Sequence, residues 1–223
     1  SRISKRLVSS GALEIVATAA PGIRDILVLG KVKSLERLGE ADLVVLDAPA
    51  AGHAISFLLS ARGLLDAVRV GPINTQAREV LEMLTDPARC QVLLVTLPEE
   101  TPVNELVDTA YHLEDRVGVS LGPVVVNGLY PEIRGLDVDP ADAAERVGST
   151  LRDGEAASLA AAADFRRHRM DLQRSQVARL AAQLPLSQLE LPYLFNADLG
   201  PDDLEVLATD LLRGIDALQR AGS

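Results

Sequence analysis

The sequence is poor in cysteine, basic residues and long apolar runs, and each shortage excludes a class of protein. Cys90 is the single cysteine among 223 residues, which excludes an internal disulfide and a Cys-x-x-Cys metal site. Asp and Glu (32) outnumber Lys and Arg (22), and the net charge of −10 argues against nucleic-acid binding, which needs a basic face. No apolar run approaches the roughly 18 residues of a membrane span. We therefore expect a soluble, cytoplasmic protein with no direct membrane span.

Aromatic residues are also scarce, at 3% with no Trp, whereas apolar residues make up 48% of the chain. The core should therefore be aliphatic, and the length suits one large domain better than two. A phosphate-binding loop of the Gly-x-x-x-x-Gly-Lys-Ser/Thr type is missing as well. Gly30-Lys31 is followed by Val32, and its surroundings have helical spacing.

The stretch that organises the chain is the apolar run Leu43-Val44-Val45-Leu46, which is followed by Asp47 and a small-residue loop ending in Gly52-His53. An unbroken apolar run predicts a strand covered on both faces, with Asp47 at the carboxyl edge of a parallel sheet. Ligands of open α/β folds bind at that edge, and the amides of a following helix favour phosphate. A carboxylate beside phosphate indicates a divalent cation. The alternative is that Asp47 only caps a helix.

The rest of the chain alternates predicted strands and helices, which favours an α/β fold with a doubly wound, mainly parallel sheet flanked by helices. The predicted strands are at 91–96, 123–127 and 189–193, and the predicted helices at 12–20, 21–38, 54–65, 75–85, 102–113, 155–183 and 201–219. The long helix 155–183 is a flanking element or an insertion, and its arginines at 166, 167 and 169 fit a solvated face. Asp139-Pro140 predicts the cap of a further short helix.

Three stretches, in order along the chain, resemble the ArsA family, which includes the arsenite-efflux ATPase and the ATPase that targets tail-anchored proteins. The matching pieces are Asp47-Ala-Pro-Ala-Ala-Gly52-His53, Pro98-Glu99 with the later Val125-Val126-Asn127, and Pro192 with Gly200 and the Leu-rich helix 201–215. The resemblance covers nearly the whole chain. It implies a single nucleotide-binding domain over residues 1–223, the C-terminal two-thirds of an ArsA-like P-loop NTPase whose P-loop and first strands precede Ser1.

The resemblance also implies roles for the residues around the apolar run. Asp47 matches the switch aspartate that orders the Mg shell through water, and Gly52 matches the loop that senses the γ-phosphate. Glycine at that position lets a backbone N–H approach phosphate closely. His53 matches the switch histidine, which either braces the loop or touches nucleotide. These three are the candidate catalytic residues, and Asp47 is the candidate metal residue.

Four further residues are the candidate ATP-binding set. Asn127 matches the family asparagine that reads adenine, because a carboxamide offers both a donor and an acceptor to the base edge. The alternative is that Asn127 serves only the Asn-Gly turn. Pro192 matches the wall of the adenine pocket, and Pro98 and Glu99 match the family's Pro-Glu after a strand.

The departures from the family pattern leave the function open between two hypotheses. Ala48 and Ala51 replace both switch threonines, and the paired metal-binding cysteines and Met-rich client-binding insertion are missing, so a less defined, actinobacterial-type branch fits best. The first hypothesis is a dimeric switch that binds ATP and Mg, hydrolyses ATP to ADP in the intact protein, and is inactive as this segment alone. The alternative is a non-catalytic nucleotide-binding partner of a paralogous ATPase. An unrelated α/β hydrolase or binding domain using Asp47 and His53 is the third possibility.

Overall fold

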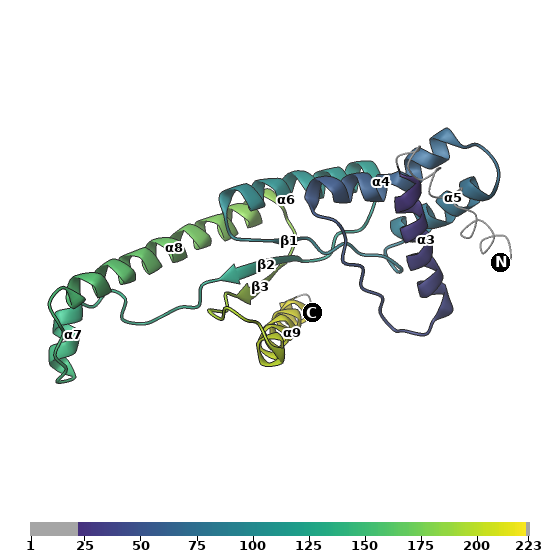
Figure 1. Cartoon of the computed structure of the whole chain (residues 1–223). Helices are drawn as coiled ribbons and strands as arrows, with labels where there is room; N and C mark the ends of the chain where they lie inside the picture. The colour runs from purple at the N-terminus through teal and green to yellow at the C-terminus, as the bar shows by residue number, and fades with distance from the viewer. Residues whose placement is uncertain (1–21, 222–223) are drawn as a thin grey trace. The chain divides into compact units, whose positions relative to one another are not determined.

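The computed structural model describes residues 22–221, whose contacts divide them into two compact units (Figure 1). The first unit comprises the described residues up to 92 together with 108–121, and the second comprises 93–107 and 122–221. The helix expected at 12–20 and its successor's predicted first residue, Pro21, lie outside the described residues. None of the described helices is long and apolar enough to cross a membrane.

The first unit is helical. It contains α3 (Ile23–Leu38), α4 (Ala51–Ala67), α5 (Pro72–Thr85) and the end of α6 (Glu100–His112), which continues into the π-helical turn η1 (Leu113–Val117). α5 begins with Pro72, whose fixed φ suits the first helical position. α3 ends at Gly39, where φ is +64°, a conformation that glycine adopts without strain. The Gly30-Lys31 pair lies inside α3, which agrees with its rejection as a phosphate loop.

Aliphatic side chains from each of these helices form the core of the first unit. α3, α4 and α5 pack against one another, and α4 also packs against η1. The fully or almost fully buried members are Ile26, Leu29, Phe57, Leu58, Ala61, Leu64, Ala77, Val80, Met83, Leu84, Ala110, Leu113 and Val117. The expectation of an aliphatic core is confirmed here, since Phe57 is its single aromatic member within the described residues.

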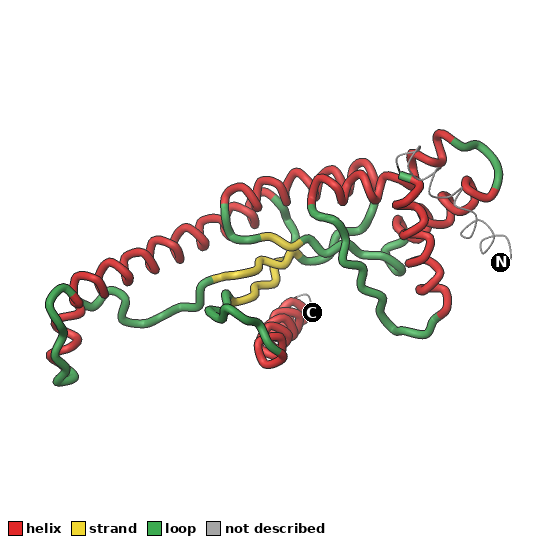
Figure 2. The backbone as a smooth tube through the Cα atoms, viewed as in Figure 1, coloured by secondary structure: helices red, strands yellow, loops and turns green. Residues whose placement is uncertain are grey.

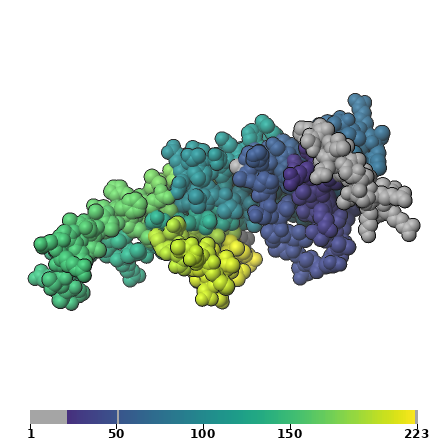
Figure 3. Space-filling view, viewed as in Figure 1, coloured from purple at the N-terminus to yellow at the C-terminus, as the bar shows by residue number. Residues whose placement is uncertain are grey.

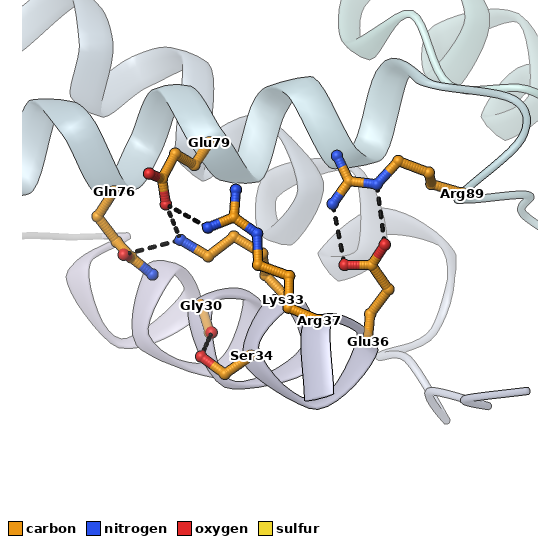
Figure 4. A network of polar contacts seen from close by, with 8 residues as sticks. All are labelled: Gly30, Lys33, Ser34, Glu36, Arg37, Gln76, Glu79 and Arg89. Atoms are coloured by element: carbon orange, nitrogen blue, oxygen red, sulfur yellow. Dashed lines mark hydrogen bonds and ion pairs between the residues drawn. The ribbon is translucent and has the colours of Figure 1, made fainter. Parts of the chain in front are cut away.

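A polar network joins α3 to α5 and to the chain just beyond α5 (Figure 4). Lys33 is only 4% exposed, and its ammonium group donates to Glu79 Oε2 at 2.5 Å and to Gln76 Oε1 at 2.9 Å. Arg89 binds both carboxylate oxygens of Glu36, each at 2.9 Å. Gly30 allows the helices to approach, because a Cβ there would lie 2.2 Å from Gln76 Nε2.

The second unit is built on three parallel strands in the order β1 (Val95–Thr96), β2 (Val124–Leu129) and β3 (Gln188–Pro192), drawn in yellow in Figure 2. Val125 pairs with Val95 on one side and with Leu189 on the other. Valines 124, 125 and 126 are almost completely buried, as expected of a central strand that is covered on both faces.

Helices cover the two sides of this sheet in Figure 1: α8 (Glu155–Gln183) packs against β2 and α9 (Pro201–Ala221) packs against β3. Gly214 permits the second contact, because a Cβ there would lie 3.0 Å from Leu189 Cδ2. No residue of α9 is fully buried, and its outer surface faces the viewer in Figure 3. Asp139 caps the short helix α7 (Pro140–Arg146), accepting from Ala141 N–H at 2.8 Å, so that prediction is confirmed.

Two strand predictions need correction. Residues 43–46 do not form a strand; their side chains are 77%, 36%, 81% and 38% exposed, and their backbone makes no hydrogen bond with another described residue. A strand is stable only beside another strand, and none of the described strands pairs with this segment. The strand expected at 91–96 shortens to Val95–Thr96, with a single bridge from Val92 to Leu121.

The start of one predicted helix also differs, because α6 begins at Glu100, two residues before the predicted helix 102–113. The small parallel sheet and the seven α-helices within residues 22–221 are consistent with the expected α/β class. The doubly wound arrangement and the P-loop NTPase type stay predictions.

Candidate functional site

The carboxyl edge of the sheet gathers four of the predicted site residues within the second unit. Pro98 and Glu99 follow β1, Asn127 lies in β2, and Pro192 ends β3, where it is in register with Leu129. Because the strands are parallel, these positions share the edge at which α/β folds bind ligands. Asn127 is half-buried, and its carboxamide has no hydrogen-bond partner in the described part of the chain. A group that needs both a donor and an acceptor fits this amide.

The two residues after β1 differ in their surroundings. Pro98 is completely buried, so it shapes the turn and does not present a surface. The turn is closed by the Glu99 N–H, which donates to Leu97 O at 2.8 Å. The Glu99 carboxylate forms an ion pair with Arg169 of α8. Glu99 is therefore already paired with a cation before any ligand is considered.

A bulge shapes the end of β2. Three residue steps from Val126 to Leu129 on β2 are matched by two steps, from Glu190 to Pro192, on β3. Gly128 has φ of +79°, in the region that favours glycine, and lies directly after Asn127. On the α8 side, the buried Gln173 accepts from Tyr130 N–H at 2.8 Å and donates to Gly128 O at 3.0 Å.

Sequence reasoning missed an aromatic cluster just beyond this edge. The rings of Tyr130, Tyr193 and Phe195 have centroids 4.7 to 5.2 Å apart. The Arg166 guanidinium lies 4.4 Å from the centroid of Tyr130 and 4.7 Å from that of Phe195, and it donates to Pro131 O at 2.8 Å. The signal in the sequence was that half of the six aromatic residues lie at the end of a predicted strand or within three residues after it.

The arginines of α8 therefore do not form one solvated face. Arg167 fits the prediction, since it is exposed and pairs with Asp164 on its own helix. Arg166 and Arg169 do not, because both reach the strand ends and bind groups there. A side chain with a long apolar stem can cover apolar surface and still place its charge on a partner, which is why the charge pattern alone was misleading.

The other three predicted residues belong to the first unit. Asp47 is exposed and lies in the irregular segment before α4, so its expected place at a strand end is wrong. Gly52 and His53 lie in the first turn of α4, which begins three residues earlier than the predicted helix. A Cβ at Gly52 would meet no atom within 4 Å, so its backbone is open to a ligand. The roles of all three residues stay predictions.

The acidic, histidine and cysteine side chains of the described residues bear on metal and thiol chemistry. No three His, Cys, Asp or Glu side chains between residues 22 and 221 gather closely enough to hold a metal ion. Asp47 alone could at most hold a cation through water, as the sequence predicted. Burial raises the pKa of the Cys90 thiol, so it stays protonated at neutral pH and is a poor nucleophile.

Comparison with known proteins adds a relationship to ATPases. The chain is 30% identical over 212 residues to the ATPase BagA of Mycobacterium tuberculosis and to a candidate ATPase of Mycobacterium bovis, covering 85% of this chain. It is 32% identical over 99 residues, 41% of the chain, to a candidate arsenical pump-driving ATPase of Halobacterium salinarum. No protein-family profile matches.

These similarities support an ArsA-like ATPase relationship and an ATPase-type function. The chain spans 61% of the length of its mycobacterial relatives and 15% of the length of the halobacterial one. The hydrolase relationship therefore concerns proteins longer than these 223 residues.

Proposed function

We propose that this chain is the adenine-binding part of an ArsA-type ATPase switch protein, whose ATP hydrolysis requires a phosphate-binding loop that these 223 residues do not contain. One observation carries the proposal: the unpaired carboxamide of Asn127 lies at the carboxyl edge of a parallel sheet, between the ends of two other strands. Similarity to ATPases over 85% of the chain supports the same conclusion.

In this proposal each side chain at the edge has one task. The Asn127 carboxamide accepts from the N6 amino group of adenine and donates to N7, a pairing that guanine, with O6 in place of N6, does not offer. Gly128 leaves room beside the base, and Pro192 forms one wall of the pocket. Glu99, held by Arg169, keeps the loop after β1 in place. We expect no direct contact with the base from the buried Pro98.

The first unit holds the proposed switch. Bound ATP with Mg would supply the phosphoryl group and the charge that neutralises it. The proposed role of Asp47 is to orient the Mg hydration shell, and that of Gly52 and His53 is to contact phosphate. The switch acts in a dimer, with a second copy or with a paralogous ATPase.

A second candidate function is a nucleotide-binding partner that does not catalyse and instead regulates a paralogous ATPase. Ala48 and Ala51 favour it, because neither offers the hydroxyl that the resembled switch uses. Both functions require adenine binding, so they differ only in turnover.

Nucleotide titration of the full natural protein tests the shared part. Asn127→Ala should weaken ATP binding by about 1–3 kcal/mol, the cost of leaving a buried polar partner unpaired, with little change for GTP. Asn104→Ala is the matched control, since Asn104 is exposed on α6 and bonds to Arg179. Isothermal titration calorimetry measures both affinities. Equal losses of affinity for ATP and GTP would mean that Asn127 serves only the Asn-Gly turn and does not read the base.

Turnover then separates the two functions. If the protein is an ATPase, Asp47→Asn should lower its ATP hydrolysis by orders of magnitude and leave its thermal unfolding unchanged, because the exposed amide keeps the shape and removes only the charge. Asp42→Asn, in the same exposed segment, is the control. A wild-type protein that binds ATP without measurable hydrolysis supports the regulatory partner.

A further inference from the structure

The end of β2 is irregular, and a side chain of α8 forms hydrogen bonds with its backbone. Gly128 O, in β2, and Tyr130 N–H, directly after β2, belong to residues two positions apart, and both lie past the end of β1. In a parallel ladder, a neighbouring strand bonds to such a pair with one residue, which donates to the first group and accepts from the second. β1 ends at Thr96, opposite Val126, so its paired residues stop short of this position.

Gln173 of α8 takes the place of that missing residue. Its Nε2 donates to Gly128 O at 3.0 Å and its Oε1 accepts from Tyr130 N–H at 2.8 Å. The chemistry fixes the orientation of the amide, because only the nitrogen can donate to a carbonyl and only the oxygen can accept from an N–H. The side chain is 2% exposed, so water does not compete for either bond.

One bonded group, Gly128 O, belongs to the bulge, where Gly128 has φ of +79°, and the other, Tyr130 N–H, lies just past the bulge. Without Gln173, Gly128 O and Tyr130 N–H would lose their partners, and the backbone at the flexible glycine would be held from the β3 side alone, where Leu129 O accepts from Tyr193 N–H at 2.7 Å. Asn127 directly precedes Gly128, so the direction of its carboxamide depends on the same backbone. Tyr130 leads into the aromatic cluster, which α8 also contacts through Arg166.

We infer that Gln173 is a positioning residue for base selection: by replacing one residue of a neighbouring strand, it holds the β2 bulge so that the Asn127 carboxamide faces adenine. The inference rests on the proposed function, and it assigns to α8 a part in reading the base. Gln173 itself does not touch the nucleotide.

The test uses Gln173→Met in the full natural protein, because methionine keeps the length of the side chain and removes both hydrogen bonds. Gln176→Met is the matched control: the same change on the same helix, at a residue that bonds to Arg179 of α8. Isothermal titration with ATP and GTP gives the preference for ATP. Gln173→Met should lower that preference about threefold to tenfold, the range of one hydrogen bond, while Gln176→Met leaves it unchanged.

A double variant shows whether Gln173 acts by positioning the Asn127 carboxamide or only by stabilising the fold. Gln173→Met added to Asn127→Ala should cause no further loss of ATP preference, because both changes act through the same carboxamide. If Gln173→Met proves too unstable to purify, Gln173→Asn replaces it, since its shorter amide cannot reach both backbone groups. Gln173→Asn should also lower the preference for ATP over GTP.

Each remaining outcome decides between the two claims. A wild-type preference for ATP in Gln173→Met, with a lost preference in Asn127→Ala, overturns the positioning role and leaves the proposed function intact. An unchanged preference in Asn127→Ala overturns the base-reading role and the positioning role together. A further loss in the double variant also overturns positioning through Asn127.

Discussion

The most buried polar side chain of each compact unit, within the described residues, has a different kind of partner. In the first unit, Lys33 and Glu79 join two helices through their side chains, and each charge is paired with another charge. In the second unit, the buried Gln173 bonds to the backbone at the end of a strand, and Arg166 lies over aromatic rings. Charge pairing between helices fixes packing, whereas bonds to strand-end backbone fix the shape of a loop. The second arrangement is the one expected where a ligand is selected.

Among the polar interactions, the largest effect should come from removing the counterion in the first unit. Glu79→Leu leaves the Lys33 ammonium, 4% exposed, with Gln76 as its remaining described hydrogen-bond partner. We expect the first unit to lose about 2–4 kcal/mol of its free energy of unfolding. Hydrogen exchange of α3 and α5 peptides, compared with β2 and β3 peptides, measures the loss unit by unit. Adding Lys33→Met should restore most of it, and a loss below about 1 kcal/mol would mean that water reaches Lys33.

A smaller effect is expected from the aromatic cluster of the second unit. Arg166→Met keeps the apolar stem but removes the guanidinium above Tyr130 and Phe195 and its bond to Pro131 O. We expect a loss of about 1–2 kcal/mol in hydrogen-exchange protection, confined to the second unit. Arg167→Met is the control and should change protection by less than about 0.5 kcal/mol, because its pair with Asp164 is exposed. Equal effects of the two variants would contradict the role of the stack.

The next expected difference between the units is in the dependence of their stability on acidic pH. The hydrogen bond from Lys33 lowers the pKa of Glu79, and the hydrogen bond from Arg89 lowers the pKa of Glu36. Because both pKa values are lower in the folded state, their stabilisation is complete above the ordinary glutamate pKa near 4.5 and is lost as pH falls through the folded values. Hydrogen exchange below pH 4.5 should therefore show α3 and α5 opening first. In Glu36→Gln/Glu79→Gln, this pH dependence should be weaker.

The smallest effect is expected on the outer surface of α9. Leu212 is 62% exposed, so Leu212→Gln should change the stability of the second unit by less than about 0.5 kcal/mol. Leu180→Ala on α8 is the contrast, since Leu180 is 1% exposed and its truncation should cost about 2–5 kcal/mol. Thermal unfolding of both variants checks the pair. A large loss in Leu212→Gln would mean that another surface covers this side chain.

Elements with strong local signals could be predicted from the sequence. The run of valines at 124–126 predicted the central strand, and the Ala- and Arg-rich stretch 155–183 predicted α8. Asp139-Pro140 predicted the start of α7. Residues 43–46 have an equally strong apolar pattern but form no strand, because pairing depends on a neighbour that a local pattern does not reveal. The π-helical turn η1 was missed for a related reason, since no simple residue pattern marks an extra residue in a helical turn.

The candidate site was predictable to a similar degree. Asn127, Pro192 and the Pro98-Glu99 pair come directly after or within predicted strands, so a parallel sheet brings them to one edge. Gln173, Arg166 and Arg169 could not be found this way. They are 39 or more residues from Asn127 in sequence, and which side of α8 faces the sheet is decided by packing. Their contacts follow from the tertiary structure.

The exposed segment between α3 and α4 determines where a protease should cut first. Residues 39–50 contain Glu40, Asp42 and Asp47 but no Lys or Arg, and all of them after Gly39 lack regular hydrogen-bonded structure. Trypsin should therefore leave the segment intact, whereas enzymes that cleave beside acidic residues should nick it early. If nucleotide and Mg engage Asp47, the same acidic sites become a footprint, and protection of the 39–50 segment reports occupancy without any measurement of turnover.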